Sequence, residues 1–228
     1  VMVHSGIEVL FQGKNFLRLM GGLWTSVWIA GVSLGFGLLL GTFLGVLRTL
    51  KNAVLRVVLR LYLEFFRIVP TIVLLFLVYY ILPRQFHVEV SAEWMAVLAF
   101  SLWVSAEFSD IIRGALESVP KHQREAGLAL GLTKGQLFVH VLMPQAFMLE
   151  LPAAINLATR VVKTTSLLMI ISVMDVINVG QQIIEANNQQ YPSGVFWICG
   201  FIFMLYFIVD YPLSLISKML QQKFSANL

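Results

Sequence analysis

The chain has 228 residues, of which 58% are hydrophobic and 12% are charged. A soluble domain of ordinary composition, with about 45–50% apolar and about 25% charged residues, is therefore excluded, and a membrane protein is indicated. The net charge of +4 does not indicate a nucleic-acid partner, because the basic residues are not gathered in one patch. The single cysteine, Cys199, excludes an intrachain disulfide and a thiolate metal site.

Five apolar stretches are each close to the length of about twenty residues that a bilayer core demands. In chain order they are residues 22–47, 61–82, 92–112, 146–176 with interruptions, and 194–217. We therefore expect an all-α membrane protein with five transmembrane helices and no separate soluble domain.

The positions of Lys and Arg predict the orientation, because cytoplasmic loops retain positive charge. Eleven of the 16 basic residues flank the first and third connections or lie in the tail, and three lie on the other side. The N-terminus is therefore predicted outside and the C-terminus in the cytoplasm. Residues 1–20 become an extracytoplasmic segment, 21–220 the membrane domain and 221–228 a cytoplasmic tail. Residues 8–13 resemble the site that picornaviral 3C proteases cut in expression tags, so no function is inferred from them.

A polar stretch at residues 125–144 separates the third and fourth spans and falls on the cytoplasmic side. Pro120 suits the first position of a helix, and Gly131 is placed to end that helix in a left-handed conformation. Thr133 and Gln136 are spaced as a capping box that starts a second helix. The spacing thus predicts a compact helical hairpin.

The second helix of the hairpin is predicted over residues 137–143, with Pro144 closing it. Small residues at Ala126, Gly127 and Gly131 would let a partner approach closely, as in helix-in-groove recognition. From spacing alone, an ordinary helical loop that caps the bundle is an equal alternative.

This stretch resembles the EAA loop of ABC importer permeases, whose usual form is E-A-A-x3-G-x9-I-x-L-P. The matching positions are Glu125, Ala126, Gly131 and Pro144. Three positions depart from the pattern: Gly127 replaces the second alanine, Val141 the isoleucine and Met143 the leucine. Residues 62–83 and 162–167 resemble the polar amino-acid branch of the same family, so the resemblance covers roughly residues 22–217.

The resemblance implies the permease subunit of a type I ABC importer in the bacterial plasma (inner) membrane, with residues 117–145 as the loop that couples it to an ATPase. The implied partners are an ATP-binding cassette ATPase homodimer, a second permease subunit, identical or homologous, and an extracytoplasmic substrate-binding protein that delivers polar amino acids. ATP and Mg would bind the ATPase. No catalytic residue, metal site or cofactor is expected in this chain, which has no G-x-x-x-x-G-K-[ST] motif.

Two alternatives to this function are a secondary carrier or channel that works without an ATPase and an ABC permease for another small polar solute. The absence of an evident inverted repeat argues against the carrier. Membrane lipid is an expected partner in every case, and nucleic acid in none.

Polar residues inside spans mark candidate functional positions, because a central charge costs about 2.5–3.5 kcal/mol on insertion scales. In the fourth span, Asn156, Arg160 and Lys163 share one helix face, with Thr164 and Ser166 close by. We expect this face to line the translocation route, where cations could meet a substrate carboxylate. Anchoring at the cytoplasmic interface is the alternative. A second polar run continues toward the outside with Asp175, Asn178, Gln182 and Glu185.

The second span carries Arg60, Glu64 and Arg67 at the same spacing. Glu64 could pair with either arginine along one helix face. Gating of the route and simple intrahelix pairing are equal interpretations of this trio.

Small residues recur every four positions in two spans, which lets helices approach closely. They are Gly37, Gly41 and Gly45 in the first span and Ser101, Ser105 and Ser109 in the third. Packing within the bundle is the favoured interpretation, and dimerisation is the alternative.

Overall fold

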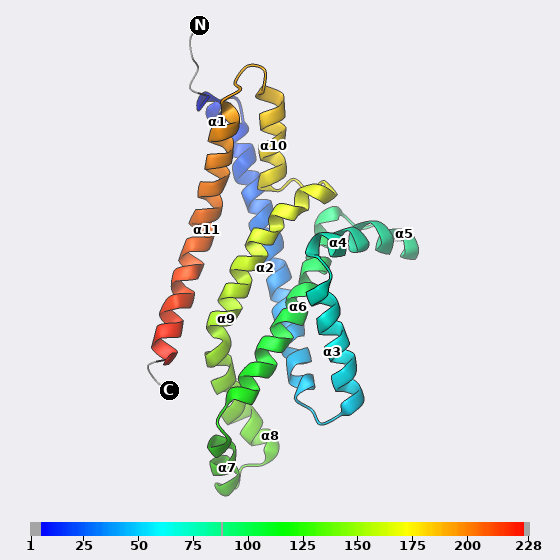
Figure 1. The fold of residues 1–228 in the computed structure, drawn as a ribbon, viewed down its shortest axis with the longest axis vertical. Coiled ribbons are helices and arrows are strands. Elements are labelled where there is room, and N and C mark those ends of the chain that lie inside the picture. Colours follow the sequence, from blue (N-terminus) through cyan, green and yellow to red (C-terminus); the bar gives the residue numbers. More distant parts are fainter. Residues whose placement is uncertain (1–5, 88, 226–228) are drawn as a thin grey trace. The chain divides into compact units, whose positions relative to one another are not determined.

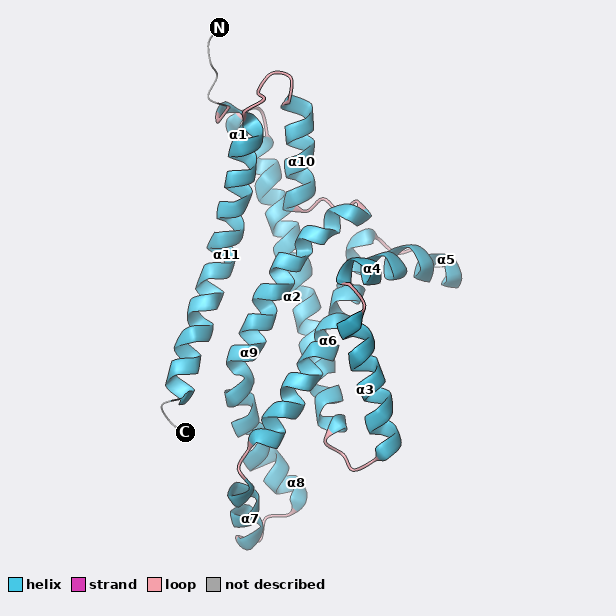
Figure 2. Cartoon of the chain, in the orientation of Figure 1, coloured by secondary structure: helices cyan, strands magenta, loops and turns pink. Residues whose placement is uncertain are grey.

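The computed structural model describes residues 6–87 and 89–225, and its regular elements there are all helices (Figures 1 and 2). The predicted all-α class is confirmed. Residues 1–5 of the predicted N-terminal segment and 226–228 of the predicted tail lie outside the described residues. In the described part, four helices are long and apolar enough to cross a membrane, and a bent pair makes a fifth candidate span.

The helices follow one another through short connections. The first half of the chain contains α1 (Glu8–Phe11), α2 (Asn15–Arg48), α3 (Ala53–Ile68), α4 (Thr71–Phe76), α5 (Leu82–Phe86) and α6 (Ala92–Ser118). The second half contains α7 (Lys121–Ala129), α8 (Lys134–Leu137), α9 (Met143–Thr164), α10 (Val176–Asn187) and α11 (Gly194–Ser225). Turns of π-helix at Leu77–Ile81 and Phe138–Leu142 join α4 to α5 and α8 to α9, and a 3-10 turn at Thr165–Ile171 follows α9.

The second predicted span is not one straight helix. The chain bends by 104° between α3 and the segment Thr71–Phe86. Pro70 explains the break, because the residue before a proline avoids helical dihedral angles, and Val69 has ψ 123°. Residues 61–82 are therefore interrupted by a bend, as in a broken span or a re-entrant loop.

The fourth predicted span ends earlier than expected. Helical structure runs over Lys134–Ile171 and stops at Ser172, which has a left-handed φ of 62°. Asp175 then starts α10, because its carboxylate accepts hydrogen bonds from the backbone N–H groups of Ile177 and Asn178, both at 3.1 Å. The second polar run thus belongs to a separate helix.

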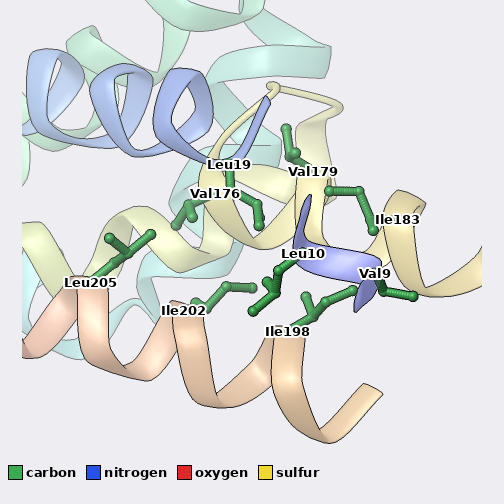
Figure 3. Close-up of a cluster of buried hydrophobic side chains, with 9 residues drawn as sticks. All are labelled: Val9, Leu10, Leu19, Val176, Val179, Ile183, Ile198, Ile202 and Leu205. Atoms are coloured by element: carbon green, nitrogen blue, oxygen red, sulfur yellow. The ribbon is translucent and has the colours of Figure 1, made fainter. Parts of the chain in front are cut away.

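The chain forms two compact units, and four of its long helices contribute to both. Unit 1 comprises Val1–Ser33, Ile72–Ala99 and Thr159–Pro212. One of its apolar clusters joins α1, the start of α2, α10 and α11 (Figure 3). Val9 of α1 and Ile183 of α10 are fully buried in this cluster. The short N-terminal helix is therefore part of the packed structure of unit 1.

Unit 2 comprises Leu34–Thr71, Phe100–Ala158 and Leu213–Leu228. Its α2 and α6 pack through the two stripes of small residues. A Cβ atom added to Gly41 would lie 2.9 Å from the Ser105 carbonyl oxygen, and one added to Gly45 would lie 2.8 Å from that of Ser109. The interpretation of these stripes as packing surfaces within the bundle is confirmed, and the hairpin described next belongs to the same unit.

Candidate functional site

The predicted hairpin is formed by α7 and α8 (Figure 1), and Gly131 lies in the connection between them. Gly131 has φ +82°, as predicted for a left-handed helix end. Its N–H donates to the Leu128 carbonyl at 3.0 Å, and the Leu132 N–H donates to the Gly127 carbonyl at 3.1 Å. These are the two hydrogen bonds of a Schellman motif, which satisfies carbonyls at the end of α7.

The predicted capping box of the second helix is confirmed. The Gln136 N–H donates to the Thr133 hydroxyl at 3.3 Å, and the Thr133 N–H donates to the Gln136 side-chain carbonyl at 2.9 Å. Two backbone donors at the start of α8 are thereby satisfied locally. The bend of the hairpin is built from short-range chemistry alone.

Both prolines take other positions than expected. Pro120 is the N-cap of α7 and precedes the first helical residue. Pro144 does not close the second helix, because α9 includes it and continues to Thr164. The π-helical turn just before it resolves the conflict: the Met143 N–H donates to the Phe138 carbonyl, five residues earlier, so the helix is wider where the proline lacks an N–H.

The small residues of the EAA-like stretch have different surroundings. Glu125, Ala126 and Gly131 are exposed, whereas Gly127 is buried. A Cβ atom on Gly127 would lie 2.5 Å from a methyl carbon of Leu137. Gly127 therefore permits close packing inside the hairpin rather than against a partner.

Two apolar side chains of the hairpin remain uncovered. Leu128 is 49% exposed and Leu130 is 83% exposed. An exposed apolar surface on an otherwise polar loop is typical of a protein-binding site. The hairpin thus offers the features that a partner could bind, next to exposed Glu125 and Ala126.

The polar face of the fourth span lies on α9. Asn156, Arg160 and Lys163 are all exposed in the single chain, and the Thr164 hydroxyl donates to the Arg160 carbonyl at 2.8 Å. Ser166 lies in the 3-10 turn that follows and is half-buried. A polar face this open is compatible with a route or with a partner subunit.

The second polar run has packing contacts within unit 1. The Arg18 guanidinium of α2 donates to the Gln182 side-chain carbonyl at 2.7 Å, and the Gln182 amide donates to Asn178 at 3.2 Å. The first of these hydrogen bonds connects α10 to the beginning of α2, and the second lies within α10. Asn178 and Gln182 of this run therefore have structural contacts.

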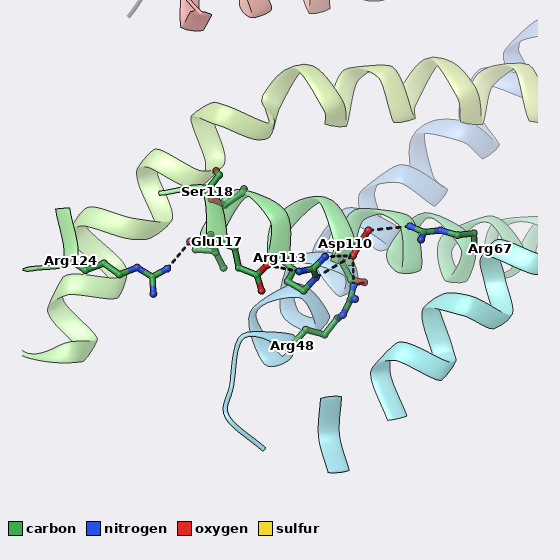
Figure 4. A network of polar contacts seen from close by, with 10 residues as sticks. Arg48, Arg67, Asp110, Arg113, Glu117, Ser118 and Arg124 are labelled. Atoms are coloured by element: carbon green, nitrogen blue, oxygen red, sulfur yellow. Dashed lines mark hydrogen bonds and ion pairs between the residues drawn. The ribbon is translucent and has the colours of Figure 1, made fainter. Parts of the chain in front are cut away.

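An acidic residue that sequence reasoning missed organises the charged side chains of unit 2 (Figure 4). Asp110 of α6 pairs with Arg48, Arg67 and Arg113, each at 3.1 Å. Arg48 is nearly buried, with 8% of its side chain exposed. Only Arg48 carried a sequence signal, because it follows the Gly37, Gly41 and Gly45 stripe by three residues and so lies near the same helix face.

The trio on α3 is arranged differently from the expected intrahelix pairing. Arg67 forms its ion pair with Asp110, and within the described residues neither Arg60 nor Arg67 forms an ion pair with Glu64. A gating role for Arg60, Glu64 and Arg67 stays a prediction. No group of three or more His, Cys, Asp or Glu side chains that could hold a metal ion occurs in the described part of the chain.

Comparisons with known proteins point to one family. A family model described as "Binding-protein-dependent transport system inner membrane component" matches residues 37–224. The L-cystine transport system permease protein TcyB of Bacillus subtilis (strain 168) is 33% identical over 214 residues, which are 94% of this chain and 89% of that protein. The glutamine transport system permease protein GlnP of Escherichia coli (strain K12) is 31% identical over 206 residues, 90% of this chain and 92% of that protein.

Solved structures agree with these sequence similarities. A chain in "Crystal structure of an amino acid ABC transporter with histidines" matches with a TM-score of 0.81 and 25% identity, over 92% of this chain and 95% of that chain. The MetNI methionine ABC transporter in an inward-facing conformation matches with a TM-score of 0.71 at 18% identity, over 90% of this chain and 97% of that chain. The second match shows the shared fold alone. The resemblance to ABC importer permeases of the amino-acid branch is confirmed.

Proposed function

Because the chain belongs to the family of inner membrane components of binding-protein-dependent transport systems, we propose that it moves polar amino acids into the cytoplasm as the permease subunit of an ATP-driven importer. It is a multi-pass membrane protein of this family. TcyB is named for L-cystine and GlnP for glutamine, which supports amino acids as the substrate class. Another small polar solute is the nearest alternative.

One observation carries the coupling part of the proposal, namely the hairpin of α7 and α8. Its bend is capped at Gly131 and Thr133, and Leu128 and Leu130 are exposed where a partner could bind them. An ATPase subunit that binds this surface could pass its motion directly into α6 and α9, the helices on either side of the hairpin. A carrier driven by an ion gradient would have no use for such a surface.

The free energy of ATP binding and hydrolysis would then act on the permease through the hairpin. ATP and Mg would bind an ATPase homodimer, and this chain would hold no cofactor of its own. Closure of the ATPase pair would move the hairpin, rock the spans and switch the route between inward-facing and outward-facing states. A binding protein on the other side of the membrane would deliver the substrate.

The substrate would pass along the polar face of α9. Asn156, Arg160 and Lys163 would meet its polar groups, and the hydroxyls of Thr164 and Ser166 would add hydrogen bonds. Five helices are too few to enclose a polar route and keep a lipid-facing exterior. A second permease subunit, identical or homologous, would therefore complete the route.

The proposal is tested by reconstitution with the cognate ATPase and binding protein. We expect ATP-dependent uptake of a labelled amino acid into proteoliposomes, and we expect Leu130→Asp to abolish both ATPase co-purification and uptake. Leu50→Asp is the matched control, because Leu50 is 48% exposed in the connection between α2 and α3 and lies outside the hairpin. It should leave both measurements unchanged.

Two results would contradict the proposal. Uptake by the isolated chain under an ion gradient, without any ATPase, would identify a secondary carrier. Normal uptake and ATPase binding by Leu130→Asp would show that the hairpin is only a helical loop of the bundle. ATP-dependent uptake of a different polar solute would support the permease function but show that amino acids are not the substrate class.

A further inference from the structure

A charged cleft of about 640 Å3 opens in unit 2, beside the ion cluster of Asp110. All of its lining residues belong to this one unit. Six arginines line it: Arg48, Arg56, Arg60, Arg67, Arg113 and Arg124. Only three carboxylates accompany them, so the lining carries an excess of positive charge.

The carboxylates neutralise only part of this set. Asp110 pairs with three arginines (Figure 4), and Glu117 pairs with Arg113 at 2.5 Å. Arg124 donates to the Leu116 carbonyl at 2.7 Å. Within the described residues, Arg56 and Arg60 form no ion pair, and Arg56 makes only a 3.4 Å hydrogen bond to the Leu50 carbonyl. Both side chains are exposed and available to an anion.

The cleft lies where membrane-crossing helices begin and end. Arg48 is the last residue of α2, Arg56 lies in the first turn of α3, and Glu117 is next to the last residue of α6. Helix ends of this kind lie close to the level of the lipid headgroups, because the apolar core spans about 30 Å. An anion in the cleft would therefore lie near the membrane surface.

The distribution of side chains around α3 is consistent with a cleft at the level of the lipid headgroups. The buried face of α3 packs into unit 2 through Leu59, Leu63 and Phe66. Its exposed apolar face carries Val54, Val57, Val58, Leu61, Phe65 and Ile68. At 100° per residue, the arginines of α3 lie between these two faces. The apolar face can contact lipid, and Arg56 and Arg60 lie in the first two turns of α3, close enough to the helix end for their side chains to reach the headgroups.

We propose that this cleft binds the phosphate of an anionic phospholipid headgroup, with Arg56 and Arg60 as its principal ligands. Guanidinium groups bind phosphate oxygens in a bidentate geometry, and two of them would match a phosphodiester. Basic pockets between membrane helices take anionic headgroups for the same reason. Asp110 holds Arg48, Arg67 and Arg113 in place around the site and limits its charge.

The test uses the full chain in a neutral detergent, titrated with phosphatidylglycerol and followed by native mass spectrometry. The double variant Arg56→Gln, Arg60→Gln should bind phosphatidylglycerol about 25-fold more weakly, since each basic residue near an anionic lipid contributes about fivefold. Both positions are exposed, so the fold should persist. Phosphatidylcholine with the same tails should bind weakly to both proteins.

A matched control removes two other charges. Lys51→Gln, Lys121→Gln changes exposed residues of unit 2 that do not line the cleft, and its affinity for phosphatidylglycerol should stay within about twofold of the unmodified chain. An equal loss in this control would show non-specific attraction and overturn the proposal. Unchanged binding in the arginine variant would overturn it as well.

Two further arms identify what occupies the cleft. If millimolar inorganic phosphate displaces phosphatidylglycerol, the cleft binds phosphate but its ligand is a soluble one. If it does not, the ligand is the lipid. An Arg60→Cys variant that cross-links to a second permease subunit, with no change in lipid retention, would show that protein covers the cleft and would overturn the proposal.

Discussion

Gly131 and Gly135 lie four residues apart in the hairpin and place different demands on the backbone. A Cβ atom at either position would meet no other atom within 4 Å, but only Gly131 has a positive φ, of +82°. Alanine at 131 would therefore cost about 1–2 kcal/mol through the left-handed backbone alone. Alanine at 135, inside α8, should stabilise the helix by about 0.5–1 kcal/mol. Hydrogen exchange of the amides of α7 and α8 measures both effects.

Asparagine provides the control for this prediction, because it tolerates the left-handed region better than alanine. Gly131→Asn should restore part of the protection that Gly131→Ala removes. Equal loss in the two variants, or equal behaviour of Gly131→Ala and Gly135→Ala, would show that backbone strain is not what Gly131 relieves.

At the residue scale, local chemistry was predictable and distant partners were not. The left-handed Gly131 and the Thr133 capping box depend on residues within a few positions, so their spacing in the sequence is sufficient. Pro144 was misread because its tolerance depends on a π-helical turn that periodicity does not reveal. Asp110 was missed because Arg48 and Arg67 lie 62 and 43 positions away.

At the element scale, the contact between α2 and α6 depends on glycine. A Cβ atom on Gly41 would lie 2.8 Å from the Phe108 Cβ atom and 2.9 Å from the Ser105 carbonyl oxygen, neither of which can rotate away. We expect Gly41→Ala to push the helices apart and to destabilise the protein by about 1–3 kcal/mol. Thermal unfolding in detergent should show this as a lower Tm.

Gly35 is the matched control on the same helix, because a Cβ atom there would meet nothing within 4 Å. Gly35→Ala should leave the Tm unchanged or raise it slightly. If both alanine variants lower the Tm equally, helix flexibility rather than close packing explains the stripe.

The elements themselves were largely predictable from apolar length, and their breaks were not. The stripes of small residues indicated close packing, but nothing in either stripe identifies its partner helix. The bend of 104° after α3 and the separate α10 follow from Pro70 and from the Asp175 cap. Both signals were present, yet hydrophobic length outweighed them in the prediction of spans.

At the scale of the whole molecule, the packing of α2 on α6 constrains the number of membrane crossings. Gly37 lies opposite Ser101, Gly41 opposite Ser105 and Gly45 opposite Ser109, so the two helices run in parallel. Two parallel spans require the chain between them to cross the membrane once in the other direction. The bent pair of α3 and the segment Thr71–Phe86 is the part of the chain that can do so. We therefore expect five crossings, with the termini on opposite sides.

Cysteine labelling tests this expectation directly. Cys199 is the only cysteine, so a Cys199→Ser background allows single cysteines to be introduced at exposed positions such as Gln12, Lys134 and Gln222. In right-side-out vesicles, a membrane-impermeant maleimide should label Gln12→Cys at once. It should label Lys134→Cys and Gln222→Cys only after permeabilisation, because the distribution of Lys and Arg predicts that both lie in the cytoplasm.

Each other labelling pattern has a distinct meaning. Labelling of Gln12→Cys and Gln222→Cys from the same side would mean an even number of crossings. The bent pair would then enter and leave the membrane on one side, and α2 and α6 could not both be spans that run in parallel. Opposite sides with Gln222→Cys outside would keep five crossings and reverse the orientation. The hairpin would then face away from the cytoplasm, where no ATPase could reach Leu130, and the proposed coupling would fail with it.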